Sequence, residues 1–371
     1  MSGIIEIPCL LLYFDRFPIP SKIQFELFVE AADEETRKNL RQLSFTRNDM
    51  IEVLKTHDAQ ESILKINEYL KYLNGFMISS KKTTVQTFGP IKFTWNSVLG
   101  KDATKEYVAY TYKFDLIMCL ATLAFAHVNV AHEQFQKYPE TSAKLIAENL
   151  KNAALIVQHM CKIDIPSWKT IPKEKPLEAD VHIMQPMINY LLASAQIIPT
   201  KKTAFLESVP NESSGKLAMF ICKSFDDLVS ILENSESWQK NGSGAYFNFF
   251  AMQYYCYMIS TRYFQSKCDK EQGNHGVACD RMNYCMTHVM PEIGKCQNMG
   301  HLSFYNEEVG KFSIQCNAYR DFVEKENATI YYLPTSGKIH DLPKNRTQYV
   351  NLEKEKDFEL PEPAFVDIRT K

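Results

Sequence analysis

Apolar residues recur at spacings of three and four along most of this 371-residue chain. That spacing places them on one face of a helix, so the pattern predicts a mostly α protein. The predicted helices cover residues 21–32, 34–57, 59–76, 105–136, 140–162, 177–198, 215–235, 244–265, 273–299 and 303–327. Turns are predicted at Pro139, Pro166, Pro199, Asn211 and Gly242. Long helices joined by short turns favour a stack of antiparallel helix pairs, with a helical core over about 105–327.

Three segments depart from the helical pattern. The first twenty residues read as strand and loop, and residues 83–95 are β-branched or aromatic around Gly89-Pro90, which predicts a short hairpin or an extended crossing segment. Residues 330–333 predict a short strand. The tail over about 335–371 is polar and carries Pro361 and Pro363, so we expect it to lie extended over the helices.

Composition narrows the function classes. Lys and Arg number 42 against 44 Asp and Glu, and this balance argues against a dedicated nucleic-acid binder. The ten cysteines are scattered through apolar segments without a CxxC pair, which favours a reducing compartment. The longest uncharged apolar run, 116–126, is too short to cross a membrane, and the N-terminus lacks the basic start of a signal peptide. We therefore expect a cytoplasmic protein.

Few residues of the sequence suggest catalysis or metal binding. His275, Cys279, Cys285 and His288 form a metal-like cluster, but the helical phase spreads them over different faces, so no metal is predicted. His127 and His132 are expected to be structural, although Glu133 could partner a general base. Phosphate-binding and nucleophile motifs are lacking. The sequence predicts no catalytic residue, no cofactor and no enzyme activity.

Five motifs in order along the chain resemble one family. They are Phe93-Thr94-Trp95, the apolar helix at 105–136, Ala193-Ser194-Ala195-Gln196, Lys216-Leu217-Ala218 and the segment 326–334. Together they resemble the BRO domain family, whose members include Alix and Brox. The resemblance implies a curved, boomerang-shaped BRO domain over 1–371, with a tetratricopeptide-like helix-hairpin core and a small β-sheet. The polar C-terminus suggests that it is the N-terminal part of a longer protein.

The resemblance also implies a function. Family members are non-enzymatic adaptors of the ESCRT pathway, and they bind the C-terminal amphipathic helix of ESCRT-III charged multivesicular body proteins during endosomal sorting and membrane remodelling. A cytoplasmic protein recruited to endosomal membranes, or to the plasma membrane, is expected. The alternative is a helical scaffold that has lost this ligand and serves another trafficking or cell-adhesion complex.

The family's docking groove maps onto particular residues here. Lys144 falls on a basic groove position, Glu140 on an acidic one and Leu217 on an apolar one, although the first two could form a solvated pair and Leu217 could be core. The sequence departs from the pattern at Pro199 and Ser213, where apolar residues are expected. Each lost aliphatic side chain weakens binding about tenfold or more. The candidates to refill the trough are Ile197, Ile198 and Leu206.

Two further surfaces follow from the residues. Tyr331 falls on a family tyrosine that is a phosphorylation and kinase-docking site in some relatives; otherwise it is a half-buried strand residue. A weak contact with an anionic membrane is predicted for lysines that could instead be solvated loop residues. These are Lys81, Lys82, Lys169, Lys173, Lys175, Lys201 and Lys202.

Overall fold

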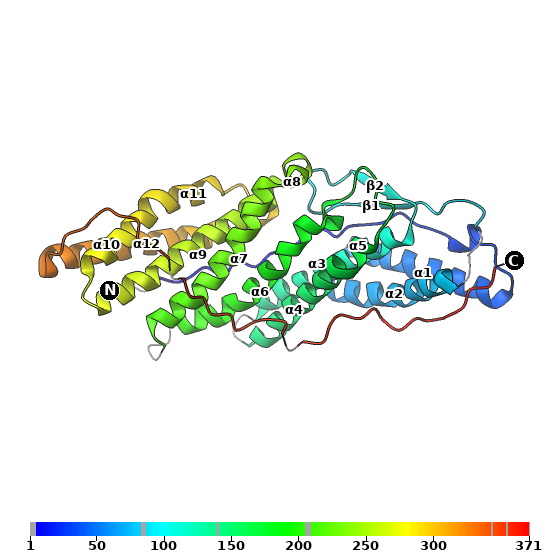
Figure 1. Ribbon diagram of the computed structural model, residues 1–371, viewed down its shortest axis with the longest axis horizontal. Helices are drawn as coiled ribbons and strands as arrows, with labels where there is room; N and C mark the ends of the chain where they lie inside the picture. The colour runs from blue at the N-terminus through cyan, green and yellow to red at the C-terminus, as the bar shows by residue number, and fades with distance from the viewer. Residues whose placement is uncertain are drawn as a thin grey trace. The chain divides into compact units, whose positions relative to one another are not determined.

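The computed structural model describes residues 5–82, 87–138, 141–204, 209–342, 344–353 and 355–370 (Figure 1). The chain divides into two compact units. Unit 1 comprises residues 1–12, 189–234 and 244–351, and unit 2 comprises residues 13–188, 235–243 and 352–371. Each unit has its own core.

Unit 2 is built on two long helix pairs. The first is α1 (Glu34–Thr56) with α2 (Ala59–Lys82), and the second is α3 (Tyr112–Lys137) with α4 (Ala143–His159). The carboxylate of Asp33 accepts a hydrogen bond from Thr36 N at 2.7 Å and so caps α1, which ends at His57 in the left-handed conformation. The shorter helices are η2 (Met160–Asp164), α5 (Ile165–Ser167), η3 (Leu177–Ala179) and α8 (Glu236–Asn241).

Helix α3 is the apolar centre of unit 2. Among the described residues it is the one helix with the length and hydropathy of a membrane span, yet 94% of its most apolar window is buried inside the protein. It packs against both α2 and α4. The apolar run at 116–126 is therefore accounted for by core packing.

A two-stranded antiparallel sheet lies next to α3. Strand β1 (Phe93–Asn96) pairs with β2 (Glu106–Ala109), with Trp95 opposite Tyr107. The small predicted sheet is thus present, but its second strand follows β1 instead of preceding it. The helix predicted from residue 105 consequently begins only at Tyr112, because 106–109 donate their backbone groups to β1.

Unit 1 is centred on α7 (Asn211–Asn234) packed along α9 (Gly244–Glu271). The part of α6 (Val181–Ala204) from residue 189 onward belongs to this unit. Its aromatic core includes Tyr190, whose ring lies 5.1 Å from that of Phe225 and 5.0 Å from that of Phe250. The remaining elements are α10 (His275–Tyr284), η4 (Cys285–Val289), α11 (Met290–Lys295), η5 (Gly300–Tyr305), α12 (Asn306–Glu326) and η6 (Asn327–Tyr331).

Several predicted elements are wrong in detail. The helix at 21–32 reduces to the 3₁₀ turn η1 (Phe25–Leu27), because distant groups take its backbone donors: Phe25 N bonds Ser44 Oγ and Ala32 N bonds Arg369 O. No turn occurs at Pro199, which lies inside α6, and Pro166 lies in α5. The helix predicted at 273–299 is divided into α10, η4 and α11.

The strand predicted at 330–333 is also wrong. A π-helical turn, η6, continues α12 as far as Tyr331. Tyr332 then adopts a left-handed φ of 54°, and its N–H bonds Asn327 O at 2.6 Å. The Asn327 side chain completes this end by bonding the backbone N–H and C=O of Leu333. Asn327 therefore caps a helix end, which is incompatible with a strand.

The C-terminal segment carries no helix over the described residues from Tyr332 to Thr370 (orange to red in Figure 1). Its first part, in unit 1, bonds α10 and the α6–α7 pair. Its second part, in unit 2, forms an ion pair with Lys151 of α4 through Glu355. It continues along α2, where Ala364 N bonds Lys71 O at 3.1 Å.

Candidate functional site

The α4 side of the predicted groove presents charge to solvent. The Lys144 side chain is 90% exposed, and its Nζ lies 3.7 Å from Glu148 Oε1, one turn later in the helix. Leu145 beside it is 42% exposed. Glu140, the predicted acidic residue, lies outside the described residues. Because exposed pairs of this kind contribute little to stability, Lys144 is available to a ligand.

The α6–α7 side is mostly core. Leu217 is 1% exposed and Ile198 5%, whereas Pro199 and Ser213 are half-buried. Leu206 lies outside the part of the chain that the structure describes. A ligand could contact the Leu217 side chain only after neighbouring groups move, so its burial agrees with the core-packing alternative.

The C-terminal segment crosses unit 1 at the level of Leu217. The Gln196 amide nitrogen donates to Leu217 O at 3.3 Å and to Thr347 O at 3.1 Å, and its oxygen accepts from Tyr349 N at 2.8 Å. Thr347 N also donates to Lys216 O at 3.1 Å. Gln196 thus links α6, α7 and the C-terminal segment in one buried hydrogen-bond network.

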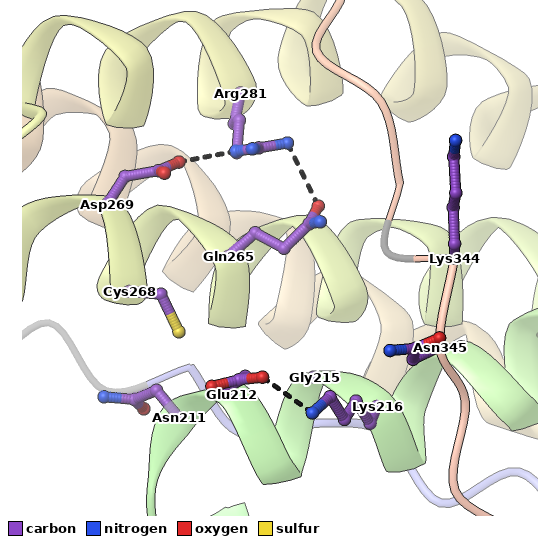
Figure 2. Close-up of a pocket in the computed structure, with 10 residues that line it drawn as sticks. All are labelled: Asn211, Glu212, Gly215, Lys216, Gln265, Cys268, Asp269, Arg281, Lys344 and Asn345. Carbon is purple, nitrogen blue, oxygen red and sulfur yellow. Dashed lines mark hydrogen bonds and ion pairs between the residues drawn. The ribbon is translucent and has the colours of Figure 1, made fainter. Parts of the chain in front are cut away.

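A hollow of about 280 Å³ opens at the start of α7 (Figure 2). Within it, Glu212 pairs with Lys216 at 2.6 Å, and Arg281 bonds Asp269 at 2.5 Å and Gln265 at 3.2 Å. Its lining is completed by Asn211, Gly215, Cys268, Lys344 and Asn345. Since its lining is mostly charged and polar, this hollow does not offer the apolar trough that an amphipathic helix needs.

A second attachment of the C-terminal segment lies at α10. The Asp280 carboxylate accepts from Ser336 N at 2.9 Å, from Ser336 Oγ at 2.7 Å and from Gly337 N at 3.0 Å, and it lies 3.2 Å from His340 Nε2. Burial opposes the ionised form, but these bonds hold the pKa of Asp280 below its ordinary value. Neither this cluster nor Gln196 could be recognised as an attachment point from local sequence, because the bonded residues are 56 or more positions apart.

Tyr331 lies at the end of η6 with 43% of its surface exposed. Its ring stacks on that of His275, with centroids 3.4 Å apart and planes 11° from parallel. The exposure and stacking of Tyr331 do not decide whether it is phosphorylated, so that role stays a prediction.

The two cysteines of the metal-like cluster, Cys279 and Cys285, are buried in the protein. The Cys279 thiol contacts Val323 O, and burial raises the pKa of Cys279 to about 11 and that of Cys285 to about 12. Over the described ranges, no group of three or more His, Cys, Asp or Glu residues could hold a metal ion. His127 bonds Asn149 at 2.8 Å, and burial lowers its pKa.

The predicted membrane-contact lysines differ in exposure. Lys81, Lys169 and Lys173 are exposed, whereas Lys175 pairs with Asp180 at 3.5 Å and Lys201 with Glu6 at 3.3 Å. The side chains of Lys82 and Lys202 lie outside the described residues. Of these lysines, Lys201 belongs to unit 1 and the others with described side chains belong to unit 2.

The paired helices and the two-stranded sheet define the class of this protein as a helical module. The comparison with protein families leads to the same class. The sequence pattern of the BRO1-like domain matches residues 22–355. The chain therefore belongs to the BRO1-like domain family. Among the curated proteins, none matches significantly.

Solved structures support the fold. The chain is similar to ALIX BRO1 in an "ALIX BRO1 CHMP4C complex", with a TM-score of 0.69 and 17% identity over 96% of this chain and 98% of that one. ALIX solved with the SIVmac239 PYKEVTEDL late domain gives a TM-score of 0.71 and 16% identity, over 96% of this chain and 50% of that one. A Bro1 domain described in terms of endosomal targeting gives 0.67 and 14%, over 93% of each chain. At these identities the likeness shows the fold alone.

Proposed function

We propose that this protein is a non-enzymatic docking module of the ESCRT pathway that binds the C-terminal amphipathic helix of an ESCRT-III charged multivesicular body protein. The observation that carries the proposal is family membership over residues 22–355. The likeness to an ALIX BRO1 domain solved with CHMP4C, over 96% of this chain, supports it. Adaptors of this kind act by binding alone.

The structure favours one part of the proposed groove over the other. Helix-in-groove recognition needs apolar contacts one helical turn apart and charges that fix the register. On α4, exposed Lys144 and Leu145 offer one of each. On α7, the Leu217 side chain is buried, and the segment at Thr347 lies over its backbone. We therefore propose that the ESCRT-III helix contacts α4 through Lys144 and Leu145.

A specific observation favours the alternative of a scaffold without this ligand. Ser213 stands where an apolar groove residue is expected, and Leu217 and Ile198 are core residues. The apolar part of the trough is correspondingly reduced. In that case the same fold would serve another trafficking or adhesion complex.

A binding measurement with an ESCRT-III C-terminal helical peptide distinguishes the two. Reversing the charge of Lys144 in Lys144→Glu should weaken peptide binding about fivefold, because an exposed ionic contact contributes about 1 kcal/mol. The matched control is Lys38→Glu, which makes the same charge change at an exposed residue of α1. Leu217→Asp is unsuitable, since a buried carboxylate would destabilise the fold whatever the ligand.

Equal affinities for Lys144→Glu and Lys38→Glu would reject the α4 contact. If the unaltered protein does not bind the peptide, the scaffold alternative is correct.

We further propose that the protein acts in the cytoplasm and is recruited to endosomal membranes, or to the plasma membrane. The endosomal-targeting role of the similar Bro1 domain supports the first location. Half-exposed Tyr331 is the proposed phosphotyrosine and kinase-docking residue.

A further inference from the structure

A second hollow, in unit 2, gathers lysines from separate segments. Its volume is about 240 Å³. Lys105 precedes β2, Lys173 and Lys175 lie between α5 and η3, and Lys240 belongs to α8. Two glutamates, Glu174 and Glu236, also line it, so the lining carries an excess of two positive charges. The remaining lining residues are Tyr107, Ser237 and Asn241.

The floor of this hollow is fixed to the rest of unit 2. Asn241 O accepts a hydrogen bond from Lys101 N at 2.7 Å, which joins the end of α8 to the loop after β1. That loop is held in turn by buried Glu178, whose carboxylate accepts from Val98 N at 2.8 Å and Leu99 N at 3.0 Å. The backbone at Asn241, which lines the hollow, is therefore held in place by hydrogen bonds.

Three lysines of the hollow act on Glu174. Its carboxylate lies 3.1 Å from Lys105 Nζ, and a hydrogen bond from that lysine is the main reason that the pKa of Glu174 is lowered. The charges of Lys240 and Lys173 lower it further. Three ammonium groups thus act on one carboxylate, although its side chain is 65% exposed and lies outside any helix.

Lys173 and Lys240 are the available donors. Both are exposed, and neither has an ion pair within the part of the chain that the structure describes. Lys175 is shared with Asp180 at 3.5 Å. An incoming anion would therefore meet two unpaired ammonium groups and would compete with Glu174 for the third, on Lys105.

We propose that this hollow binds a phosphomonoester dianion, with Glu174 as an internal competitor that occupies the site in the absence of the anion. A dianion gains more than a carboxylate from the same ammonium groups, because the Coulomb energy scales with charge. Lysine is a common point-charge ligand of phosphate. The volume is below the usual range of about 300–1,000 Å³ for drug-sized ligands, which suits one phosphorylated headgroup. The site is independent of the ESCRT-III docking proposed above.

The test uses the full chain and three probes: inorganic phosphate, inositol 1,4,5-trisphosphate measured by calorimetry, and phosphatidylcholine vesicles with or without phosphatidylinositol 4,5-bisphosphate. The double variant Lys173→Glu/Lys240→Glu should lose about tenfold or more in affinity, since each lysine near an anionic surface contributes about a factor of five. Glu174→Gln should gain about threefold, because it removes the competing charge. The matched control, Lys38→Glu/Lys162→Glu, makes the same charge change at exposed lysines outside the hollow and outside the predicted membrane-contact set.

The gain in Glu174→Gln is the sharper result, because this variant removes the proposed competitor and leaves all four lysines of the hollow in place. Binding of inositol trisphosphate without recruitment to vesicles would support the site and assign a soluble ligand. Recruitment to vesicles that inositol trisphosphate reverses would support it and assign a lipid headgroup. Equal losses in the two double variants, no effect of Glu174→Gln, or no binding of any probe would overturn the proposal.

Discussion

A fully buried ion pair in unit 2 is formed by Asp115 and Arg47. The Asp115 carboxylate accepts from Arg47 Nη2 and Trp95 Nε1, each at 2.7 Å, and from Tyr69 Oη at 2.5 Å. The Arg47 and Asp115 side chains are both 0% exposed. The cluster joins α1, α2, β1 and α3. A buried ion pair is tolerable only when most of its polar atoms are bonded. Here Arg47 Nη1 also donates to Ser21 O at 2.7 Å, whereas Arg47 Nε has no hydrogen-bond partner among the described residues.

We predict that Asp115→Asn lowers the free energy of unfolding by about 3–5 kcal/mol, because it leaves the Arg47 charge uncompensated in the core. The double variant Arg47→Met/Asp115→Leu should lose less than the single one, since it removes both charges and keeps the volume filled. Urea unfolding followed by circular dichroism measures both. A double variant at least as unstable as the single one would contradict this explanation.

Sequence showed only part of this cluster. Trp95 was recognisable within the Phe93-Thr94-Trp95 motif, whereas Asp115 precedes an apolar run with nothing local to mark it as buried. Its partners lie 68, 46 and 20 residues away. Such convergence depends on packing between helices, which hydrophobic periodicity does not describe.

At the element scale, helices were predicted well where their hydrogen bonds are local. Residues 34–57 and 59–76 gave α1 and most of α2. The errors fall where distant groups supply the partners: 21–32 bonds Ser44 and Arg369, and 106–109 bonds β1. The C-terminal segment is the extreme case, because it has no local hydrogen-bond ladder and is positioned by side chains such as Asp280 and Gln196.

We predict that acid releases the Asp280 attachment selectively. The folded-state pKa of Asp280 is lowered, so its contribution is present above the ordinary value of about 3.9 and is lost as the pH falls through the folded pKa. Hydrogen-exchange protection factors of the Ser336 and Gly337 amides should therefore fall below about pH 4. In Asp280→Asn they should be low at neutral pH and should not change with pH.

The Tyr349 amide provides the internal control. It is held by the Gln196 side chain, which does not titrate, so its protection should persist in acid and in Asp280→Asn. Parallel loss at Tyr349 would mean that the whole segment detaches as one unit.

At the scale of the whole molecule, all ten cysteines carry free thiols, and all except Cys268 are buried. Burial, reinforced by Glu271 and Asp269, raises the pKa of Cys268 to about 11. Because the thiolate is the nucleophile, even this half-exposed cysteine reacts slowly near neutral pH. The scattered thiols are thus largely core residues.

We predict that iodoacetamide labels the native protein at Cys268 alone, at a rate that rises with pH, and labels all ten cysteines in denaturant. Mass spectrometry counts the adducts, and Cys268→Ser should abolish native labelling. Rapid modification of further cysteines in the folded protein would show that the cores open more readily than their burial indicates.

Apolar periodicity and ordered motifs are properties of neighbouring residues, so the fold class, the helix pairs and the family could be recognised from the sequence alone. The tertiary structure decided which residues a ligand can reach. It left Lys144 in solvent, buried Leu217 and brought Lys105 and Lys240 into one hollow. Exposure and electrostatic fields depend on segments more than a hundred residues apart. Local sequence therefore could not distinguish a groove leucine from a core leucine, or a solvated lysine from a candidate phosphate ligand.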